Sequence, residues 1–346
     1  MMKMNVLACR LAYSLAMTLL MGSVAAQNNV TGLQSVFTSA DVPRSFSGVA
    51  VIAKGNEITF SYTSASQSVS SDLAAPAFTL QTPFVTASLS KQMTAALVMR
   101  EVGQGRVDLD APISQYLNYL KGKWNAVITI RQLLNHLSGI VAVDKPLKTV
   151  PGEVFAYSNT GYNLLGELVA TTSGKDYEML ASDMFEYCGM DNTSPSSNTN
   201  NALRYHEKSL GELVEITKDL PASTTPSAGI ISTAEDLVAW NQCLHNSDLI
   251  SAKSHVQMVA KGATRKHRWG ELGYGFGLQL SDKAAIQEWS HSGYVLDYIS
   301  TLSYYPKSDT SMILLENISW YPKDMTRVFH YHDKLRSQLL KQLINK

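Results

Sequence analysis

The sequence is poor in cysteine and has no excess of charge of either sign. Its 346 residues contain three cysteines, and Lys+Arg and Asp+Glu number 29 each. The balanced charge gives no electrostatic reason to expect a nucleic-acid partner, and no basic run or basic–aromatic pattern argues for one. With 45% hydrophobic residues, the composition is globular and allows one large domain or two interleaved lobes.

Several chemical signatures are also missing. No G-x-S-x-G sequence occurs, which argues against an α/β-hydrolase. No dinucleotide-binding or phosphate-binding loop is visible, so we expect no cofactor. His330 and His332 are two residues apart in a predicted helix and point to different sides, so we expect no metal site there.

The N-terminus has the pattern of an export signal. Lys3 and Arg10 precede an apolar run at 11–21, and small residues at 22–26 fit a signal-peptidase site. The run is short for a membrane span and polar residues follow it. We therefore expect residues 1–26 to be removed, leaving a periplasmic or secreted chain, 27–346, with no stable membrane anchor.

Only Cys188 and Cys243 remain in the mature chain, because Cys9 lies within the expected signal. Cys9 also precedes the apolar run, which excludes lipid attachment at that position. In an oxidising compartment the other two cysteines could pair, but two free buried thiols fit the sequence equally well.

Strand patterns occur at both ends of the chain, with helical patterns between them. Residues 46–62 predict two strands around a turn at 54–56, and residues 298–305 and 310–317 predict two more. Thr129 with Gln132, and Ser232 with Glu235, have the spacing of capping boxes. A closing helix is predicted over 323–343. The fold class is therefore α+β, with one antiparallel sheet built from both chain ends (about 27–85 and 270–346), flanked by helices, and an inserted all-helical lobe (about 86–269).

The stretch TASLSKQMTAALVM, residues 86–99, predicts a buried helix that has a lysine in its first turn. An amine is poorly tolerated in a core without a partner. Ser88 lies three residues before Lys91, so both side chains can share one face. A desolvated lysine has a lowered pKa and can remove the proton of a serine hydroxyl, which makes Ser88 a candidate nucleophile and Lys91 its base.

Two further motifs follow along the chain: Tyr157-Ser158-Asn159, and His291-Ser292-Gly293 just before a predicted strand. In the order S-x-x-K, Y-x-N and [KH]-[ST]-G, the three motifs resemble those of the serine penicillin-recognising hydrolases. This family includes class C β-lactamases, D-alanyl-D-alanine carboxypeptidases and related esterases and aminopeptidases. Other family-like runs are GRVDLDAPISQYL at 105, ITIRQLLNHLSGI at 128, SAGIISTAEDLVAW at 227 and YGFGLQL at 274.

The resemblance implies a β-lactamase/DD-peptidase-like fold and a reaction through an acyl-enzyme. Ser88 would be acylated while Lys91 and Tyr157 exchange its proton and pass it to the leaving group. The backbone N–H groups of Ser88 and Tyr294 would form an oxyanion hole. The implied substrate-binding residues are Asn159, His291, Ser292 and Gly293.

The sequence also departs from the family pattern. His291 stands where class C β-lactamases carry lysine, and a histidine offers less fixed positive charge to a substrate carboxylate. Tyr294 follows where many relatives have glycine, and only residues 140–150 separate Gly139 from Pro151, where relatives commonly carry a longer helical insert. His136, in the LNHLSG run, is predicted to be a structural histidine in a turn.

These patterns predict an exported serine hydrolase that acts through an acyl-enzyme on a small-molecule or peptide substrate, either an ester or a D-amino-acid peptide. One alternative is a true β-lactamase that hydrolyses β-lactam antibiotics. The other is a catalytically idle protein that binds penicillin or peptidoglycan peptides as a sensor. The alternative of an idle protein is disfavoured because a binding module needs no activated nucleophile, and this sequence retains Ser88, Lys91, Tyr157 and Asn159.

Overall fold

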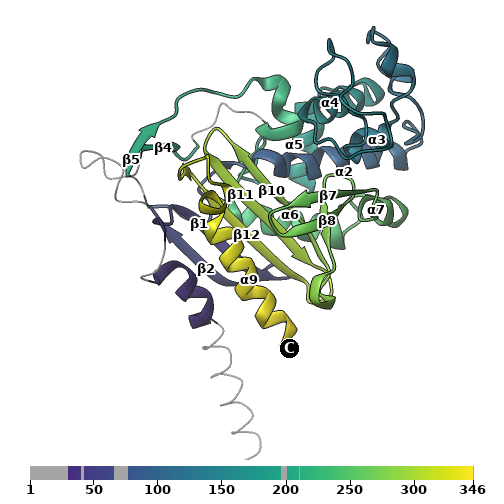
Figure 1. Ribbon diagram of the computed structural model, residues 1–346. Helices are drawn as coiled ribbons and strands as arrows, with labels where there is room; N and C mark the ends of the chain where they lie inside the picture. The colour runs from purple at the N-terminus through teal and green to yellow at the C-terminus, as the bar shows by residue number, and fades with distance from the viewer. Residues whose placement is uncertain (1–29, 40–42, 66–76, 196–200, 210, 346) are drawn as a thin grey trace, which may run out of the picture. The chain divides into compact units, whose positions relative to one another are not determined.

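The computed structural model describes residues 30–39, 43–65, 77–195, 201–209 and 211–345 (Figure 1). These residues fall into two compact units: 44–330 form one, and 30–39 and 43 join 331–345 in the other. The expected signal segment, 1–26, lies outside the described residues, as does Cys9.

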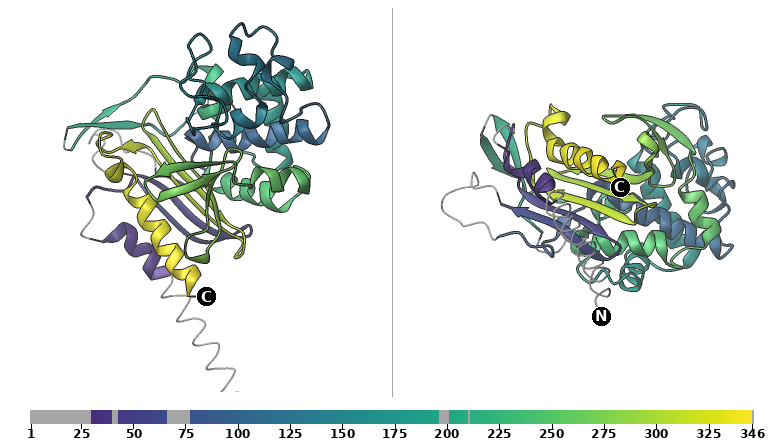
Figure 2. Two further views of the ribbon diagram at one scale, coloured as in Figure 1. Left: turned by 45° about the vertical axis from the view of Figure 1, so that its right-hand side comes forward. Right: turned by 90° about the horizontal axis from the view of Figure 1, so that it is seen from below.

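An antiparallel eight-stranded sheet is the frame of the larger unit (Figures 1 and 2). The strand order is β2-β1-β12-β11-β10-β9-β8-β7. Strand β1 pairs with β12 along its whole length, from Gly48 opposite Glu316 to Lys54 opposite Thr310. This pairing confirms the prediction that the sheet is built from distant parts of the chain. The strands are β1 Gly48–Lys54, β2 Glu57–Ser64, β7 Ala263–His267, β8 Gly270–Tyr274, β9 Gln279–Ser281, β10 Glu288–Val295, β11 Tyr298–Tyr305 and β12 Thr310–Glu316.

Both predicted hairpins are present. The β1–β2 turn uses Gly55 with φ of 56°, a left-handed conformation that glycine adopts at little steric cost. In β1, only Lys54 is exposed, because the strand lies inside the sheet and is covered on both faces. Strands β11 and β12 are buried along their full lengths, so the centre of the sheet belongs to the hydrophobic core.

Helices of the segment between β2 and β7 gather beside this sheet (Figure 2). As predicted, helix α2 is buried on nearly every side, from Ser90 through Met99. The helices of the larger unit are α2 Ser90–Gly103, α3 Ile130–Leu134, α4 Asn159–Ser173, α5 Tyr177–Tyr187, α6 Ala234–Asn246, α7 Ala252–Met258 and α8 Met325–Val328.

One of the two predicted capping boxes is confirmed and the other is displaced by one residue. Thr129 and Gln132 cap α3 reciprocally. At α6 the cap is Thr233, whose side chain accepts from the backbone N–H of Asp236. Ser232 belongs instead to strand β6, Ile231–Ser232, which pairs with β3, Phe84–Val85. Two adjacent hydroxyl residues each precede an acid by three positions, so local spacing alone did not distinguish them.

The inserted segment is not purely helical. Strands β4 (Tyr205–Ser209) and β5 (Glu212–Glu215) form a small sheet with β13 (Ile318–Ser319). The C-terminal set of strands in the large sheet also begins earlier than expected, at Ala263 and not near residue 270. Both departures involve short, charged, partly exposed strands that lack the apolar alternation by which strands are recognised.

The smaller unit consists of a helix at residues 30–38 and the part of α9 (His330–Ile344) from Tyr331 onward. The rings of Phe37 and Tyr331 stack at a centroid distance of 5.5 Å. The predicted closing helix, 323–343, is present as two helices, since α8 ends at Val328 before α9 begins.

Candidate active site

Ser88 lies in a short 3-10 helix, Ala87–Leu89, that runs directly into α2. The preceding residue, Ala87, has a φ of 51°, a left-handed conformation uncommon for a residue other than glycine. The segment is anchored on both sides of Ala87. Thr86 donates to the carbonyl of Ile230 from its backbone N–H and its hydroxyl, each at 2.8 Å, and Ser90 Oγ donates to the carbonyl of Ala87 at 2.7 Å. Ser88 is thus held on a fixed, strained turn.

Lys91 is fully buried beside Ser88. Its Nζ donates to Ser88 Oγ at 3.3 Å, to Asn159 Oδ1 at 2.7 Å and to the carbonyl of Ser227 at 2.7 Å. Burial holds the pKa of the Lys91 amine well below its ordinary value, and the positive charge of Arg265 lowers it further. The partners of a buried amine, which the sequence left open, are therefore Ser88, Asn159 and a backbone carbonyl.

Tyr157 contacts the same hydroxyl from the other side. Its Oη donates to Ser88 Oγ at 2.7 Å, and Lys91 Nζ lies 4.7 Å from the centre of its ring. Although 38% of the residue is exposed, its hydroxyl end points inward. Desolvation raises the pKa of Tyr157 to about 12, against the lowering effects of its hydrogen bond to Ser88 and of Arg265. The phenol therefore stays protonated near neutral pH.

His291 lines the same cavity as Ser88 and Tyr157, and both of its ring nitrogens have protein partners. The side chain is buried, and its two ring nitrogens lie 3.0 Å from Tyr274 Oη and 2.8 Å from the carbonyl of Ser292. Its ring centre is 6.3 Å from that of Tyr157, with no hydrogen bond between these two described side chains. Burial, and then the charges of Lys91 and Arg265, hold the pKa of His291 well below its ordinary value, so the imidazole is neutral at pH 7.

Strand β10 brings the third motif against the Ser88 turn. A Cβ on Gly293 would lie 2.7 Å from both the Ala87 Cβ and the Thr86 carbonyl oxygen, so only glycine allows this approach. Strand β10 pairs with β9 only through residues 288–290. Residues 291–295 therefore have β11 as their single partner strand within the described sheet, which leaves one edge of β10 open beside Ser88.

Ser292 and Tyr294 also line the cleft. Ser292 Oγ accepts from Arg268 at 3.2 Å. Tyr294 is 37% exposed, and its hydroxyl lies 2.9 Å from Ser319 Oγ and donates to Asp297 at 3.3 Å. The ring is tethered at its far end, while its backbone stays on the open edge of β10.

A cavity of about 510 Å³ lies over these residues, and it contains a feature that the sequence analysis did not identify. Arg265, Lys266 and Arg268 line it from strand β7 and the turn after it, and no aspartate or glutamate is among the described lining residues. The guanidinium of Arg265 lies 5.7 Å from the ring centre of Tyr157. The TRKHR run at 264–268 was visible in the sequence, but charged residues in a hairpin are usually only solvent-exposed.

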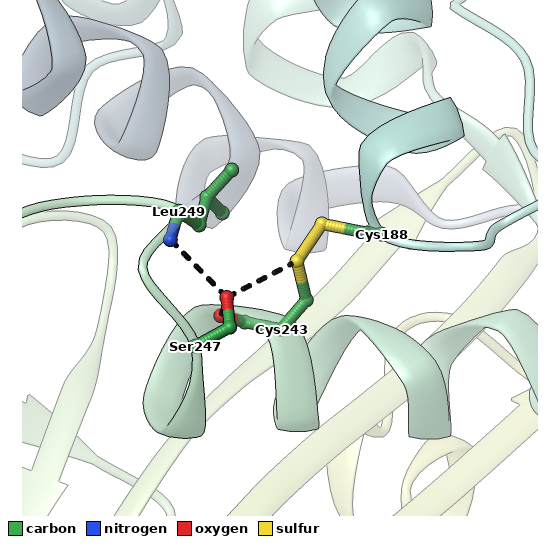
Figure 3. The surroundings of a disulfide bond; sticks show 4 residues. All are labelled: Cys188, Cys243, Ser247 and Leu249. Carbon is green, nitrogen blue, oxygen red and sulfur yellow. Dashed lines mark hydrogen bonds between the residues drawn. A yellow bond between two sulfur atoms is a disulfide. The ribbon is translucent and has the colours of Figure 1, made fainter.

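Cys188 and Cys243 form a disulfide with a Cα–Cα distance of 5.5 Å (Figure 3). The bond joins the end of α5 to α6. The two cysteines are therefore paired, and the alternative of two free thiols is wrong. Ser247 lies beside it, with its hydroxyl 3.7 Å from Cys243 Sγ.

Residues 34–334 match the family model described as Beta-lactamase. The chain therefore belongs to the β-lactamase family, the group of serine hydrolases that the three motifs predict.

Individual relatives are more distant. Penicillin-binding protein 4* of Bacillus subtilis (strain 168) is 24% identical over 336 residues, covering 84% of this chain and 72% of that protein. The D-alanyl-D-alanine-carboxypeptidase/endopeptidase AmpH of Escherichia coli (strain K12) is 28% identical over 196 residues, covering 47% and 49%. The solved D-amino acid amidase of Ochrobactrum anthropi SV3 superposes with a TM-score of 0.77 at 21% identity, covering 91% and 99%, which shows the shared fold.

Within the described ranges, no helix has the length and apolar character needed to cross a bilayer. The same ranges contain no group of three or more His, Cys, Asp or Glu side chains arranged to hold a metal ion.

Proposed function

We propose that this protein hydrolyses an ester or a D-amino-acid peptide through an acyl-Ser88 intermediate. The observation that carries the proposal is the position of Ser88 Oγ, which contacts both a lysine of lowered pKa and a protonated tyrosine. An idle sensor would have no need of this arrangement, because binding alone requires no activated hydroxyl.

The two pKa shifts assign different roles to the neighbours of Ser88. A neutral Lys91 can keep its bonds to Asn159 and the Ser227 carbonyl and turn its lone pair toward Ser88 Oγ, so it is the general base. Tyr157 has its pKa raised to about 12, so it acts as a proton donor and not as the initial base.

The reaction then balances without a cofactor. Ser88 Oγ bonds to the substrate carbonyl carbon as its proton moves to the Lys91 amine, and the oxyanion faces the backbone N–H groups of Ser88 and Tyr294. Collapse breaks the bond to the leaving oxygen or nitrogen, which takes the proton from Lys91 directly or through the Tyr157 phenol. Water then attacks the acyl carbon, gives a proton to Lys91, and Ser88 leaves and recovers it.

The cationic wall of Arg265, Lys266 and Arg268 supports a substrate that carries an anionic group. A fixed guanidinium in a partly dry cleft attracts a carboxylate, and no lining acid in the described cavity competes for it. A D-amino-acid peptide ends in such a carboxylate, which agrees with the carboxypeptidase activity for which the AmpH relative is named. Penicillins carry one too, so β-lactam hydrolysis is the competing activity in the test below.

We also propose that the protein is exported. The pairing of Cys188 with Cys243 suits an oxidising compartment, as does the signal pattern at residues 1–26. The N-terminus of the exported protein is expected near Ala26 or Gln27. An intact Met1 in the exported fraction would contradict cleavage.

The central test is covalent labelling followed by a chase. Wild-type protein should take up a fluorophosphonate or a labelled penicillin at one equivalent, and Ser88→Ala should take up none. Ser90→Ala is the comparison variant: its hydroxyl bonds to the Ala87 carbonyl and accepts from the Ile230 N–H, so its loss removes one anchor of the turn but not the nucleophile, and labelling should slow far less than in Ser88→Ala. Full labelling of Ser88→Ala would refute the proposal.

Release of the label separates the candidate activities. Rapid loss of the penicillin label with turnover of a cephalosporin indicates a β-lactamase, and turnover of a D-Ala-D-Ala peptide or an ester indicates the proposed hydrolase. A label that persists with no turnover of any of these substrates supports the binding protein.

A further inference from the structure

Three buried aromatic side chains connect the second motif to the third. Ser158, inside Tyr157-Ser158-Asn159, and Ser292, inside His291-Ser292-Gly293, lie at the two ends of a continuous hydrogen-bonded series. The contacts are Ser158 N to His136 Nδ1 at 3.1 Å, His136 Nε2 to Tyr274 Oη at 3.2 Å, Tyr274 Oη to His291 Nε2 at 3.0 Å, and His291 Nδ1 to the Ser292 carbonyl oxygen at 2.8 Å.

The backbone groups at the two ends fix the direction of every bond. The Ser158 N–H can only donate, so His136 Nδ1 carries no proton and its Nε2–H donates to Tyr274. The Ser292 carbonyl can only accept, so His291 carries its proton on Nδ1 and its Nε2 accepts from the Tyr274 hydroxyl. Each histidine therefore has one defined neutral tautomer.

An additional proton on His291 disrupts this series. If His291 Nε2 were protonated, Tyr274 Oη would face two N–H donors, and its own hydroxyl proton would have to turn away from His291 toward the neighbouring Tyr162 hydroxyl. His291 is also surrounded by groups that oppose a positive charge on its ring or cannot compensate it. Those facing it are Lys91 from α2, Arg265 and His267 from β7, Tyr274 from β8, and Tyr157 and His136 from the segment before α4.

We propose that Tyr274 is a positioning residue that locks His136 and His291 in these tautomers and so ties the Tyr157 segment to the open edge of β10. The expected effect of Tyr274 on activity rests on the proposed function, but the tautomers of the two histidines do not depend on it. In this arrangement both ring nitrogens of His291 are hydrogen-bonded within the protein. The positive charge offered to a substrate therefore comes from strand β7.

The location of Tyr274 suits this role. It ends strand β8, is fully buried, and its ring packs against Phe155, two residues before Tyr157, at 5.3 Å. Replacing it with phenylalanine keeps the ring and removes only the hydroxyl. His136 Nε2–H then loses its acceptor, and His291 Nε2 loses the donor that keeps it unprotonated.

The test uses ¹⁵N-histidine NMR of the full protein from pH 5 to 8, together with kcat/KM over the same range. In wild type, two histidines should show fixed tautomers, one protonated on Nε2 and the other on Nδ1, with no titration. Assignment uses the disappearance of each signal in His136→Asn and His291→Asn. In Tyr274→Phe, the ¹⁵N signals of both histidines should shift, because His136 Nε2–H loses its acceptor and His291 Nε2 loses its donor, and kcat/KM should fall about tenfold across the range.

Tyr177→Phe is the matched control. Tyr177 is also buried and loses one hydrogen bond of similar length, its 2.7 Å contact with Thr94 Oγ1, but it lies outside the series. Its histidine spectra and pH profile should follow wild type. Titration of His291 in wild type, or matching profiles for Tyr274→Phe and Tyr177→Phe, would overturn the inference. The wild-type spectra decide the tautomers even if Tyr274→Phe fails to fold, and failure of Ser88 labelling would leave them unaffected.

Discussion

The two sides of the cleft differ in the kind of group that they present. One side consists of the N-terminal end of α2 and the segments just before α2 and α4, and it supplies Ser88, Lys91 and Tyr157. Burial shifts the lysine and the tyrosine toward their neutral forms. The side formed by β7 and the turn after it supplies three basic side chains, Arg265, Lys266 and Arg268. Under the proposed function, the reaction and the recognition of charge are thus placed on different elements.

This separation has a physical reason. A base must lose its proton near neutral pH, which requires a dry site, whereas an anion is held by a cation that never loses its charge. The two sides still interact electrostatically, because the charge of Arg265 lowers the pKa of Lys91 and opposes the rise in the pKa of Tyr157. The predictions below test this division, beginning with the largest expected effect.

Removing the base should abolish most activity. Lys91→Ala deletes the proposed acceptor of the Ser88 proton, so acylation should slow by roughly a thousandfold or more, as for a member of a cooperating catalytic set. The rate of fluorophosphonate labelling measures this step. A Lys91→Ala protein that acylates within tenfold of wild type would show that another group is the base.

Removing the phenol should have a smaller effect. Tyr157→Phe keeps the ring under Arg265 but loses the proton donor, so kcat/KM should fall about a hundredfold. The loss should be greater for a poor leaving group, such as an amide, than for a p-nitrophenyl ester, because only the poor leaving group needs protonation. Equal losses for both substrates would assign Tyr157 a purely structural role.

Neutralising the charged side should change selectivity more than rate. Arg265→Gln should reduce the ratio of kcat/KM for an anionic substrate to that for a neutral ester by about tenfold. Since Arg265 lowers the pKa of Lys91, its loss should also move the acid limb of the pH profile to higher pH.

Lys253→Gln, an exposed charge change on α7, is the control for Arg265→Gln and should alter neither the ratio nor the limb. A ratio unchanged in Arg265→Gln would place the anion elsewhere.

The smallest effect concerns stability. His136, His245 and His291 all have pKa values well below their ordinary value because they are buried. The unfolded chain therefore binds more protons as the pH falls through about 6.5, so stability is fully present above that pH and is lost below it. Lowering the pH from 7 to 5 should reduce Tm by roughly a few degrees, measured by calorimetry. A Tm that is constant across this range would contradict the neutral state of these residues.

The sequence predicted the central sheet, the buried helix α2 and the grouping of Ser88 with Lys91 and Tyr157, because each has a strong local pattern. It did not predict the role of Tyr274, since a tyrosine in a short strand gives no sign that it lies between two histidines 138 and 17 residues away in the chain. His291 was expected to assist Tyr157 or to bind a substrate carboxylate or carbonyl, and nothing in the sequence indicated that both of its ring nitrogens would have partners within the protein. Orientation within a strand depends on pairing partners, and β8 and β9 were not recognised as strands.

The close approach of Gly293 to Ala87 limits how this site can be redesigned. Any side chain at position 293 would collide with backbone, and Ala87 already has a backbone conformation that larger residues resist. The nucleophile turn and β10 are therefore poor targets for a mutagenesis library. Libraries that aim at new substrates should vary Arg265, Lys266 and Arg268, which line the cavity and have ordinary backbone conformations.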